Sequence, residues 1–144
     1  RGAGPVRSLI GKISNFDPDT GEMLKRDSSL LQFRAGNGFW HVDSSFKAVP
    51  ALASLLYGRT VPPPGTGGDT EFVSSRLAFA SLSKSQQDDL RGRVGVHDFC
   101  YSVGLTGASA SSRRPWRRWL PPARHFLVRE TEYGPSLYVG KHCS

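Results

Sequence analysis

Long apolar runs and cysteines are both scarce in this sequence. No apolar run approaches the roughly 18 residues that a membrane-spanning helix needs, which excludes an integral membrane protein. The 144 residues include only 2 cysteines, Cys100 and Cys143. Two cysteines cannot form a disulfide framework, although a single bridge between them remains open. We therefore expect a reducing, cytoplasmic setting.

An apolar signal-peptide core is also lacking. The sequence begins with Arg1 rather than Met, so we expect a mature piece or a fragment. Its length predicts one domain at most, residues 1–144, and a chain of this size buries roughly two-thirds of the surface that unfolding exposes. The 16 glycines and 10 prolines predict frequent turns and no long uninterrupted helix.

Acidic residues are few, at 12 against 19 lysines and arginines. Four of the arginines lie within residues 113–119, and without them the net charge falls from +7 to +3. The excess is therefore local, and a nucleic-acid footprint over the whole surface is not expected. One interpretation of this segment is a solvated loop, or a lid that attracts an anionic substrate. The alternative is that its arginines and tryptophans bind a polyanion or a membrane surface.

Turn-forming residues separate short apolar stretches along the chain. The hydroxyl of Ser83 and the amide of Gln86 have the spacing of a capping box, which predicts a helix to about Arg91. These elements together predict a β-rich sandwich or barrel with short helices. A second helical pattern covers residues 74–82, a turn is predicted at residues 17–21, strands at residues 7–16, 39–46, 52–61, 94–103, 125–131 and 136–140, and loops at residues 22–36, 62–68 and 104–124.

His41 and Asp43 are the candidate metal ligands. In a strand, residues i and i+2 point to the same face, so the imidazole and the carboxylate can aim at one point while Val42 faces the packing. A second imidazole from elsewhere would complete the 2-His-1-carboxylate triad that suits Fe(II). By themselves the three residues fit a hydrogen-bonded pair on a surface strand better than a metal site.

A glycine pair further along offers a second candidate site. Gly67 and Gly68 let the backbone turn tightly and approach a ligand closely. Thr70 then places a hydroxyl beside whatever binds there. An ordinary β-turn before a strand explains the glycines equally well but leaves the surrounding residues without a role.

Several strings of this sequence occur together in one known family. They cover residues 37–46, 61–63, 67–72, 127–129 and 137–139, in that order. Together they resemble the TauD/TfdA family of Fe(II)- and 2-oxoglutarate-dependent dioxygenases. Their amino-acid sequences are most similar to those of the 2,4-dichlorophenoxyacetate dioxygenase branch, including its fungal members. The resemblance covers about residues 8–144.

The resemblance implies a fold, an activity and a set of site residues. The fold is part of a double-stranded β-helix, or jelly roll, mainly β with short helices. His41 and Asp43 match two iron ligands, Thr70 matches a residue that contacts a carboxylate of 2-oxoglutarate, and Asn37 matches a position beside the substrate pocket. The implied reaction is hydroxylation of a small organic anion with dioxygen, with release of succinate and CO2.

The chain also departs from the family pattern. The family's second iron-binding His and its carboxylate-binding Arg lie farther downstream than this chain reaches, so we expect a partial and inactive domain. Exposed strand edges in such a piece favour a homo-oligomer. A degenerate relative that binds a polyanion through residues 113–119 is the alternative. His97, His125 and His142 match no ligand position, and we expect each to be exposed or hydrogen-bonded.

Overall fold

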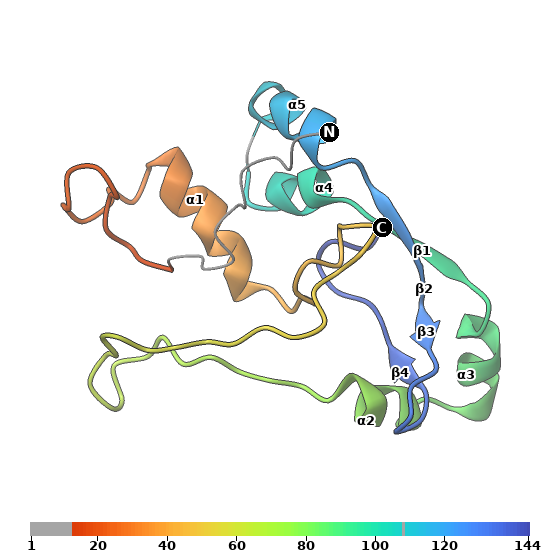
Figure 1. Ribbon diagram of the computed structural model, residues 1–144. Helices are drawn as coiled ribbons and strands as arrows, with labels where there is room; N and C mark the ends of the chain where they lie inside the picture. Colours follow the sequence, from red (N-terminus) through yellow and green to blue (C-terminus); the bar gives the residue numbers. More distant parts are fainter. Residues whose placement is uncertain (1–12, 108) are drawn as a thin grey trace, which may run out of the picture.

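The computed structural model describes residues 13–107 and 109–144 of the chain. Its regular elements are short throughout (Figure 1). The helices are α1 (Ser29–Ala35), the 3-10 helix η1 (Gly36–Gly38), α2 (Ser75–Ala80), α3 (Lys84–Leu90), α4 (Phe99–Gly104) and α5 (Ala110–Trp119). The strands are β1 (Val94–His97), β2 (Ala123–Phe126), β3 (Val128–Arg129) and β4 (Ser136–Leu137).

Two antiparallel ribbons organise the second half of the chain. β1 pairs with β2, and β3 pairs with β4. The last residues extend the first ribbon, because the backbone N–H of Ser144 donates to the carbonyl of Val96 at 3.0 Å. His97 and Cys143 form a further antiparallel bridge. The end of the chain is thereby fastened beside β1.

Side-chain caps begin α1, α2, α3 and α4; before α1 the Ser28 hydroxyl accepts the backbone N–H of Leu31. The Ser74 hydroxyl accepts a backbone N–H in the first turn of α2, and the Ser83–Gln86 capping box before α3 forms both of its bonds. Both predicted helices are thus confirmed. Asp98 accepts two backbone N–H groups at the start of α4. This cap ends β1, so only the first part of the strand predicted at 94–103 is a strand.

The buried side chains belong mainly to residues 75–144, which we call the body. Phe79 from α2 is 2% exposed, and Tyr138, beyond β4, is 8% exposed. Polar side chains are buried with them, because helix caps and strand ends meet in this region. The buried apolar residues are Phe79, Cys100, Ala123, Val128 and Tyr138, and the buried polar residues are Ser45, His97, Asp98, Ser102 and His142.

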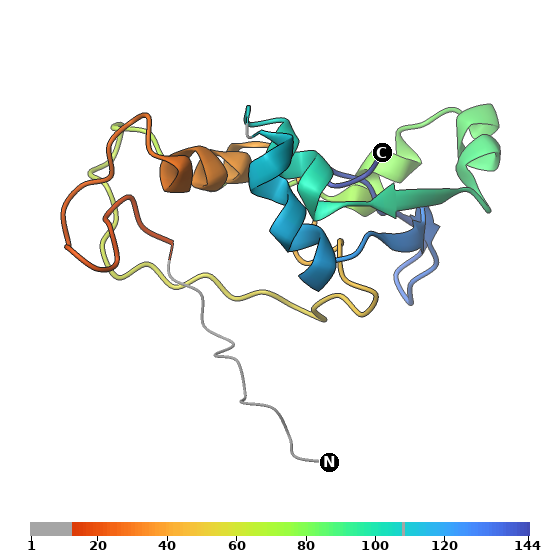
Figure 2. The ribbon, with the colours of Figure 1, turned by 90° about the horizontal axis from the view of Figure 1, so that it is seen from above.

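Residues 47–74, which we call the arm, leave the body as a long excursion and return to α2 (Figures 1 and 2). Every residue from 51 to 74 is exposed, and Leu52 and Leu55 are 105% and 95% exposed. The strand predicted at 52–61 is wrong, because no neighbouring segment pairs with it among the described residues. The proline-rich stretch 62–68 is irregular, as predicted.

Three other predictions differ from the structure. The segment 39–46 is not a strand: a turn covers residues 43–46, and Ser44 has a φ of 58°, which breaks an extended course. The loop predicted at 22–36 contains α1. The loop predicted at 104–124 contains α5, which packs on α4. α5 has a distant packing partner in α4, whereas α1 begins at a local cap in which the Ser28 hydroxyl accepts the backbone N–H of Leu31 at 3.2 Å.

The first part of the chain agrees with prediction where it is described. The strand predicted at 7–16 lies largely outside the described residues, and its end pairs as a single bridge between Phe16 and Met23. The turn between them is confirmed, because Gly21, with a φ of 74°, donates its N–H to the Asp17 carbonyl at 3.0 Å.

The predicted fold class is confirmed only in part. Short helices are present as expected, but the described strands form two separate ribbons rather than the facing sheets of a jelly roll. Within residues 13–107 and 109–144, no helix has the length and apolar character needed to cross a membrane.

Candidate functional site

His41 and Asp43 approach each other as the metal hypothesis requires. The Nε2 atom of His41 lies 3.3 Å from Oδ1 of Asp43. The predicted strand is absent here: the pair lies in an irregular segment that leads into a turn. Both side chains are open to solvent, at 26% and 57% exposure, so an ion can reach them.

The hydrogen bonding of His41 suits a metal ligand. Its Nδ1 lies 2.7 Å from the carbonyl of Phe39, so Nδ1 carries the proton that is donated there. Nε2 is then left facing the Asp43 carboxylate. Two ligand atoms bound at about 2.1 Å and at right angles lie about 3 Å apart. The observed separation therefore fits one cation held between the two side chains.

A third ligand is not assembled here. Among the described residues, no group of three His, Cys, Asp or Glu side chains is arranged to hold a metal ion. His41 and Asp43 thus make a two-ligand site that leaves most of the coordination sphere open. Their role as ligands remains a prediction that the geometry is compatible with.

A cavity of about 420 Å³ adjoins this pair. Asn37 and Asp43 lie on its wall, so two of the predicted site residues come together. Thr70 is not on this wall and lies exposed in the arm. Its contact with 2-oxoglutarate remains a prediction. Lys141 and His142 also line the cavity, and sequence analysis did not identify them as site residues.

The end of the chain supports the segment that carries the candidate ligands. A Cβ atom at Gly140 would lie 2.9 Å from Cα of His41, so only glycine allows this close approach. The next residue, Lys141, donates its backbone N–H to Trp40 O at 2.9 Å and its ammonium to Gly36 O at 2.5 Å. Sequence spacing contains no signal for contacts between residues so far apart.

His142 is a buried and hydrogen-bonded residue of the cavity wall. It is 4% exposed, and its Nδ1 lies 2.7 Å from the hydroxyl of Ser102. Burial, reinforced by the charges of Lys141 and His41, lowers the pKa of His142 to about 4. The ring is therefore neutral at neutral pH. The expectation of a hydrogen-bonded histidine is confirmed here.

The other two histidines differ from each other. His125 is half-buried, and its Nε2 lies 3.0 Å from the carbonyl of Lys47. His97 is fully buried, and neither of its ring nitrogens makes a hydrogen bond to the described residues. The expectation that His97 is exposed or hydrogen-bonded is wrong. Burial lowers the pKa of His97, and the neighbouring charges of His125 and Arg129 act in the same direction.

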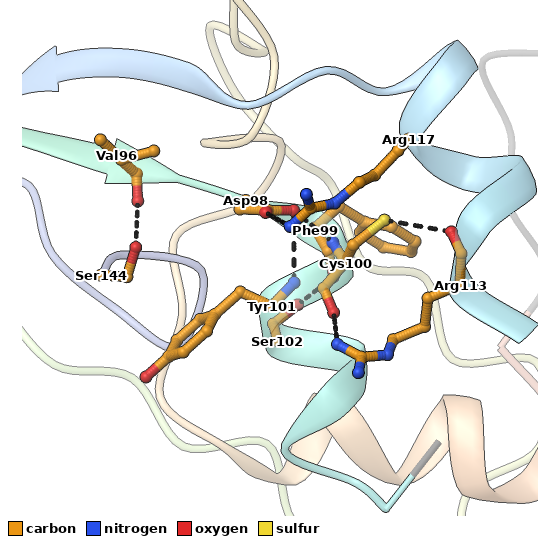
Figure 3. Close-up of polar contacts among 9 residues, drawn as sticks. All are labelled: Val96, Asp98, Phe99, Cys100, Tyr101, Ser102, Arg113, Arg117 and Ser144. Carbon is orange, nitrogen blue, oxygen red and sulfur yellow. Dashed lines mark hydrogen bonds and ion pairs between the residues drawn. The ribbon is translucent and has the colours of Figure 1, made fainter. Parts of the chain in front are cut away.

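The arginine-rich segment is a helix held against α4 (Figure 3). Arg117 forms an ion pair with the buried carboxylate of Asp98 at 2.9 Å, and Arg113 donates to the carbonyl of Cys100 at 2.9 Å. The Cys100 thiol donates in return to the Arg113 carbonyl at 3.4 Å. Burial and the nearby Asp98 raise the pKa of this thiol. Two of the four arginines thus contact α4, and the segment is a helix rather than the expected solvated loop.

Comparison with known proteins gives one consistent result. The family described as taurine catabolism dioxygenase TauD, TfdA family matches residues 7–142. The alpha-ketoglutarate-dependent 2,4-dichlorophenoxyacetate dioxygenase of Cupriavidus pinatubonensis is 36% identical over 138 residues, which cover 94% of this chain and 46% of that protein. The (S)-phenoxypropionate/alpha-ketoglutarate-dioxygenase of Sphingobium herbicidovorans is 32% identical over 109 residues, covering 72% of this chain and 36% of its own length.

A solved structure is similar over almost the whole chain. The crystal structure of AAD-2 in complex with Mn(II) and N-oxalylglycine aligns with a TM-score of 0.78 and 34% identity. The alignment covers 90% of this chain and 47% of AAD-2. The chain thus spans about half the length of the most extensive of these matches. With the family match over residues 7–142, this places the chain in the TauD/TfdA dioxygenase family.

Proposed function

We propose that this chain is part of an Fe(II)- and 2-oxoglutarate-dependent dioxygenase that hydroxylates a small organic anion. The observation that carries the proposal is the pairing of His41 Nε2 with Asp43 Oδ1 at 3.3 Å beside a cavity of about 420 Å³. Membership of the TauD/TfdA family supports it. So do the cofactors named for its relatives, alpha-ketoglutarate in the enzymes and Mn(II) with N-oxalylglycine in AAD-2.

Each predicted residue has a distinct task in this proposal. His41 and Asp43 hold the metal, with His41 oriented by its bond to the Phe39 carbonyl. Asn37 contacts the substrate in the cavity that it lines. Thr70 donates its hydroxyl to a carboxylate of 2-oxoglutarate, which requires the arm to lie closer to the pair in the complete domain. That domain is a jelly roll to which this chain contributes a part.

The bound cofactors supply the oxidising chemistry, in which 2-oxoglutarate and dioxygen yield succinate, CO2 and a hydroxylated substrate. The residues of this chain bind and orient the metal, the co-substrate and the substrate. The imidazole and carboxylate keep their lone pairs directed at one point, and the rings of Phe46 and Phe99 line the adjoining cavity. The small-molecule partners of this reaction are the organic anion and dioxygen, with 2-oxoglutarate as co-substrate.

We expect the 144-residue chain by itself to release no succinate. Two protein ligands leave a divalent ion weakly held, and the described residues contain no arranged third ligand. The assay supplies 2-oxoglutarate, Fe(II), ascorbate and oxygen to the chain and to its His41→Ala variant. Succinate formation that depends on His41 would contradict this expectation and would require a third imidazole from within the chain.

Metal binding tests the proposal directly. We expect the chain to bind Mn(II) weakly, and His41→Ala or Asp43→Asn to weaken the affinity at least tenfold, because each removes one of two ligands. Binding is measured by electron paramagnetic resonance of free Mn(II). Asp88→Asn is the matched control, because Asp88 is an exposed carboxylate on α3 that pairs with Lys84. Equal Mn(II) affinity in all four proteins would refute the assignment of the ligands.

A further inference from the structure

Lys141 is a cation on the cavity wall that forms no direct ion pair within the part of the chain that the structure describes. Burial lowers the pKa of Lys141, and the charge of Asp43 on the same wall acts in the opposite direction. Lys141 lines the cavity together with Asp43 and Asn37. None of the ion pairs formed among the described residues involves Lys141. Its partner is instead the carbonyl of Gly36, at 2.5 Å from Nζ. The positive charge of Lys141 therefore remains available to a ligand in the cavity.

The ammonium group has the right number of donors for a second partner. Lysine carries three N–H donors and no acceptor. One donor is used by the Gly36 carbonyl, which fixes the position of Nζ at the cavity wall. The remaining two can donate to the two oxygens of a carboxylate, and hydrogen bonds between charged groups are shorter and stronger than neutral ones.

Part of the cavity wall is aromatic. Phe46 and Phe99 both line the cavity, and their ring centroids lie 4.9 Å apart. A small apolar or aromatic group can pack against these rings while its anionic end meets Lys141. Asp43 is the acid that lines the same cavity; it lies 3.3 Å from His41, and its charge also acts on Lys141.

We propose that Lys141 binds the carboxylate of the primary substrate and thereby selects organic acids with an apolar or aromatic body. The inference rests on the proposed function, because it assigns the anionic end of the substrate of that same site. It identifies a specificity-determining residue rather than a ligand of the metal. The named substrates of two relatives, 2,4-dichlorophenoxyacetate and phenoxypropionate, are acids of this shape.

The test compares an anion with its neutral isostere on the metal-free 144-residue chain. Isothermal titration with phenoxyacetate and with phenoxyacetamide separates the effect of the charge from that of the ring. We expect the wild type to prefer the anion by about tenfold, as a charge-assisted hydrogen bond provides. Lys141→Gln should abolish this preference, and Lys141→Arg should retain most of it.

Two controls make the result specific. Lys84→Gln removes the same charge from exposed α3 and should keep the wild-type preference. Titration with N-oxalylglycine tests the co-substrate as the alternative source of the carboxylate. If Lys141→Gln weakens binding of N-oxalylglycine but not of phenoxyacetate, the assignment to the primary substrate is overturned.

The comparison of the two probes on the wild type needs no variant, so a poorly folded Lys141→Gln cannot obscure it. Equal affinity of the wild type for phenoxyacetate and phenoxyacetamide overturns the inference. Mn(II) binding by His41 and Asp43 is measured separately. A chain that binds Mn(II) but shows no preference for the anion refutes the role of Lys141 alone. A preference for the anion without Mn(II) binding supports Lys141 and refutes the proposed function instead.

Discussion

The arm and the body are both rich in apolar residues, yet only the body buries them. Leu52 in the arm is fully exposed, at 105%, whereas Phe79 in the body is 2% exposed. The difference lies in the partners available to each segment. In the body, β1 is flanked by β2 on one side and by the end of the chain on the other. Apolar residues of high β propensity form a strand only where such partners exist.

The backbone shows the same contrast. In the body, Val96 exchanges hydrogen bonds with Ser144, and Tyr138 donates to the Leu127 carbonyl at 2.8 Å. In the described residues 51–73, the hydrogen bonds of the backbone are limited to the turn in which Thr66 donates to Pro63 at 3.2 Å. The arm therefore contributes little to stability by itself, and its unpaired backbone N–H and C=O groups are available for pairing.

The largest expected effect comes from truncating one apolar side chain in each region. Phe79→Ala should lower the free energy of unfolding by about 3–5 kcal/mol, because it empties a buried site. Leu52→Ala should change it by less than about 0.5 kcal/mol. Urea denaturation followed by circular dichroism measures both. A large loss in Leu52→Ala would show that the arm packs against the body or a second copy in solution.

A smaller effect is expected where the body supports the candidate ligands. Gly140→Ala places a Cβ atom 2.9 Å from Cα of His41, and relief of this overlap should cost about 1–3 kcal/mol. Gly38→Ala is the matched control, because nothing lies within 4 Å of its added Cβ. Urea denaturation again compares the two. Equal stabilities would show that the chain end does not contact the His41 segment in solution.

The smallest expected effect concerns the attachment of α5. Arg117→Gln removes the ion pair with Asp98, whose side chain is only 7% exposed, and should cost about 1 kcal/mol because Arg117 itself is 63% exposed. Arg118→Gln should have almost no effect, because Arg118 stacks on exposed Trp119 at 6.0 Å. Thermal denaturation at low and high salt distinguishes them. Equal melting temperatures of the two variants would indicate that α5 is not held by Asp98.

Local signals in the sequence predicted some elements correctly. The hydroxyl and amide of Ser83 and Gln86 lie three residues apart, so their bonds depend only on nearby atoms, and α3 forms as predicted. The turn at 17–21 is local in the same sense. α5 was missed because two of its arginines, Arg117 and Arg113, are bound by the Asp98 carboxylate and the Cys100 carbonyl, which precede α5 in the chain and meet it only in the fold.

The sequence by itself determined the family and the locally capped helices and turns. It also determined the proximity of His41 to Asp43, because two residues separated by a single residue in the chain cannot lie far apart. The tertiary structure decided which apolar segments became strands, since a strand needs hydrogen-bonding neighbours that no local pattern specifies. It also brought Lys141 and His142 to the cavity beside Asp43. That juxtaposition depends on the chain end packing beside β1 and over the His41 segment, at a distance along the sequence that spacing arguments do not reach.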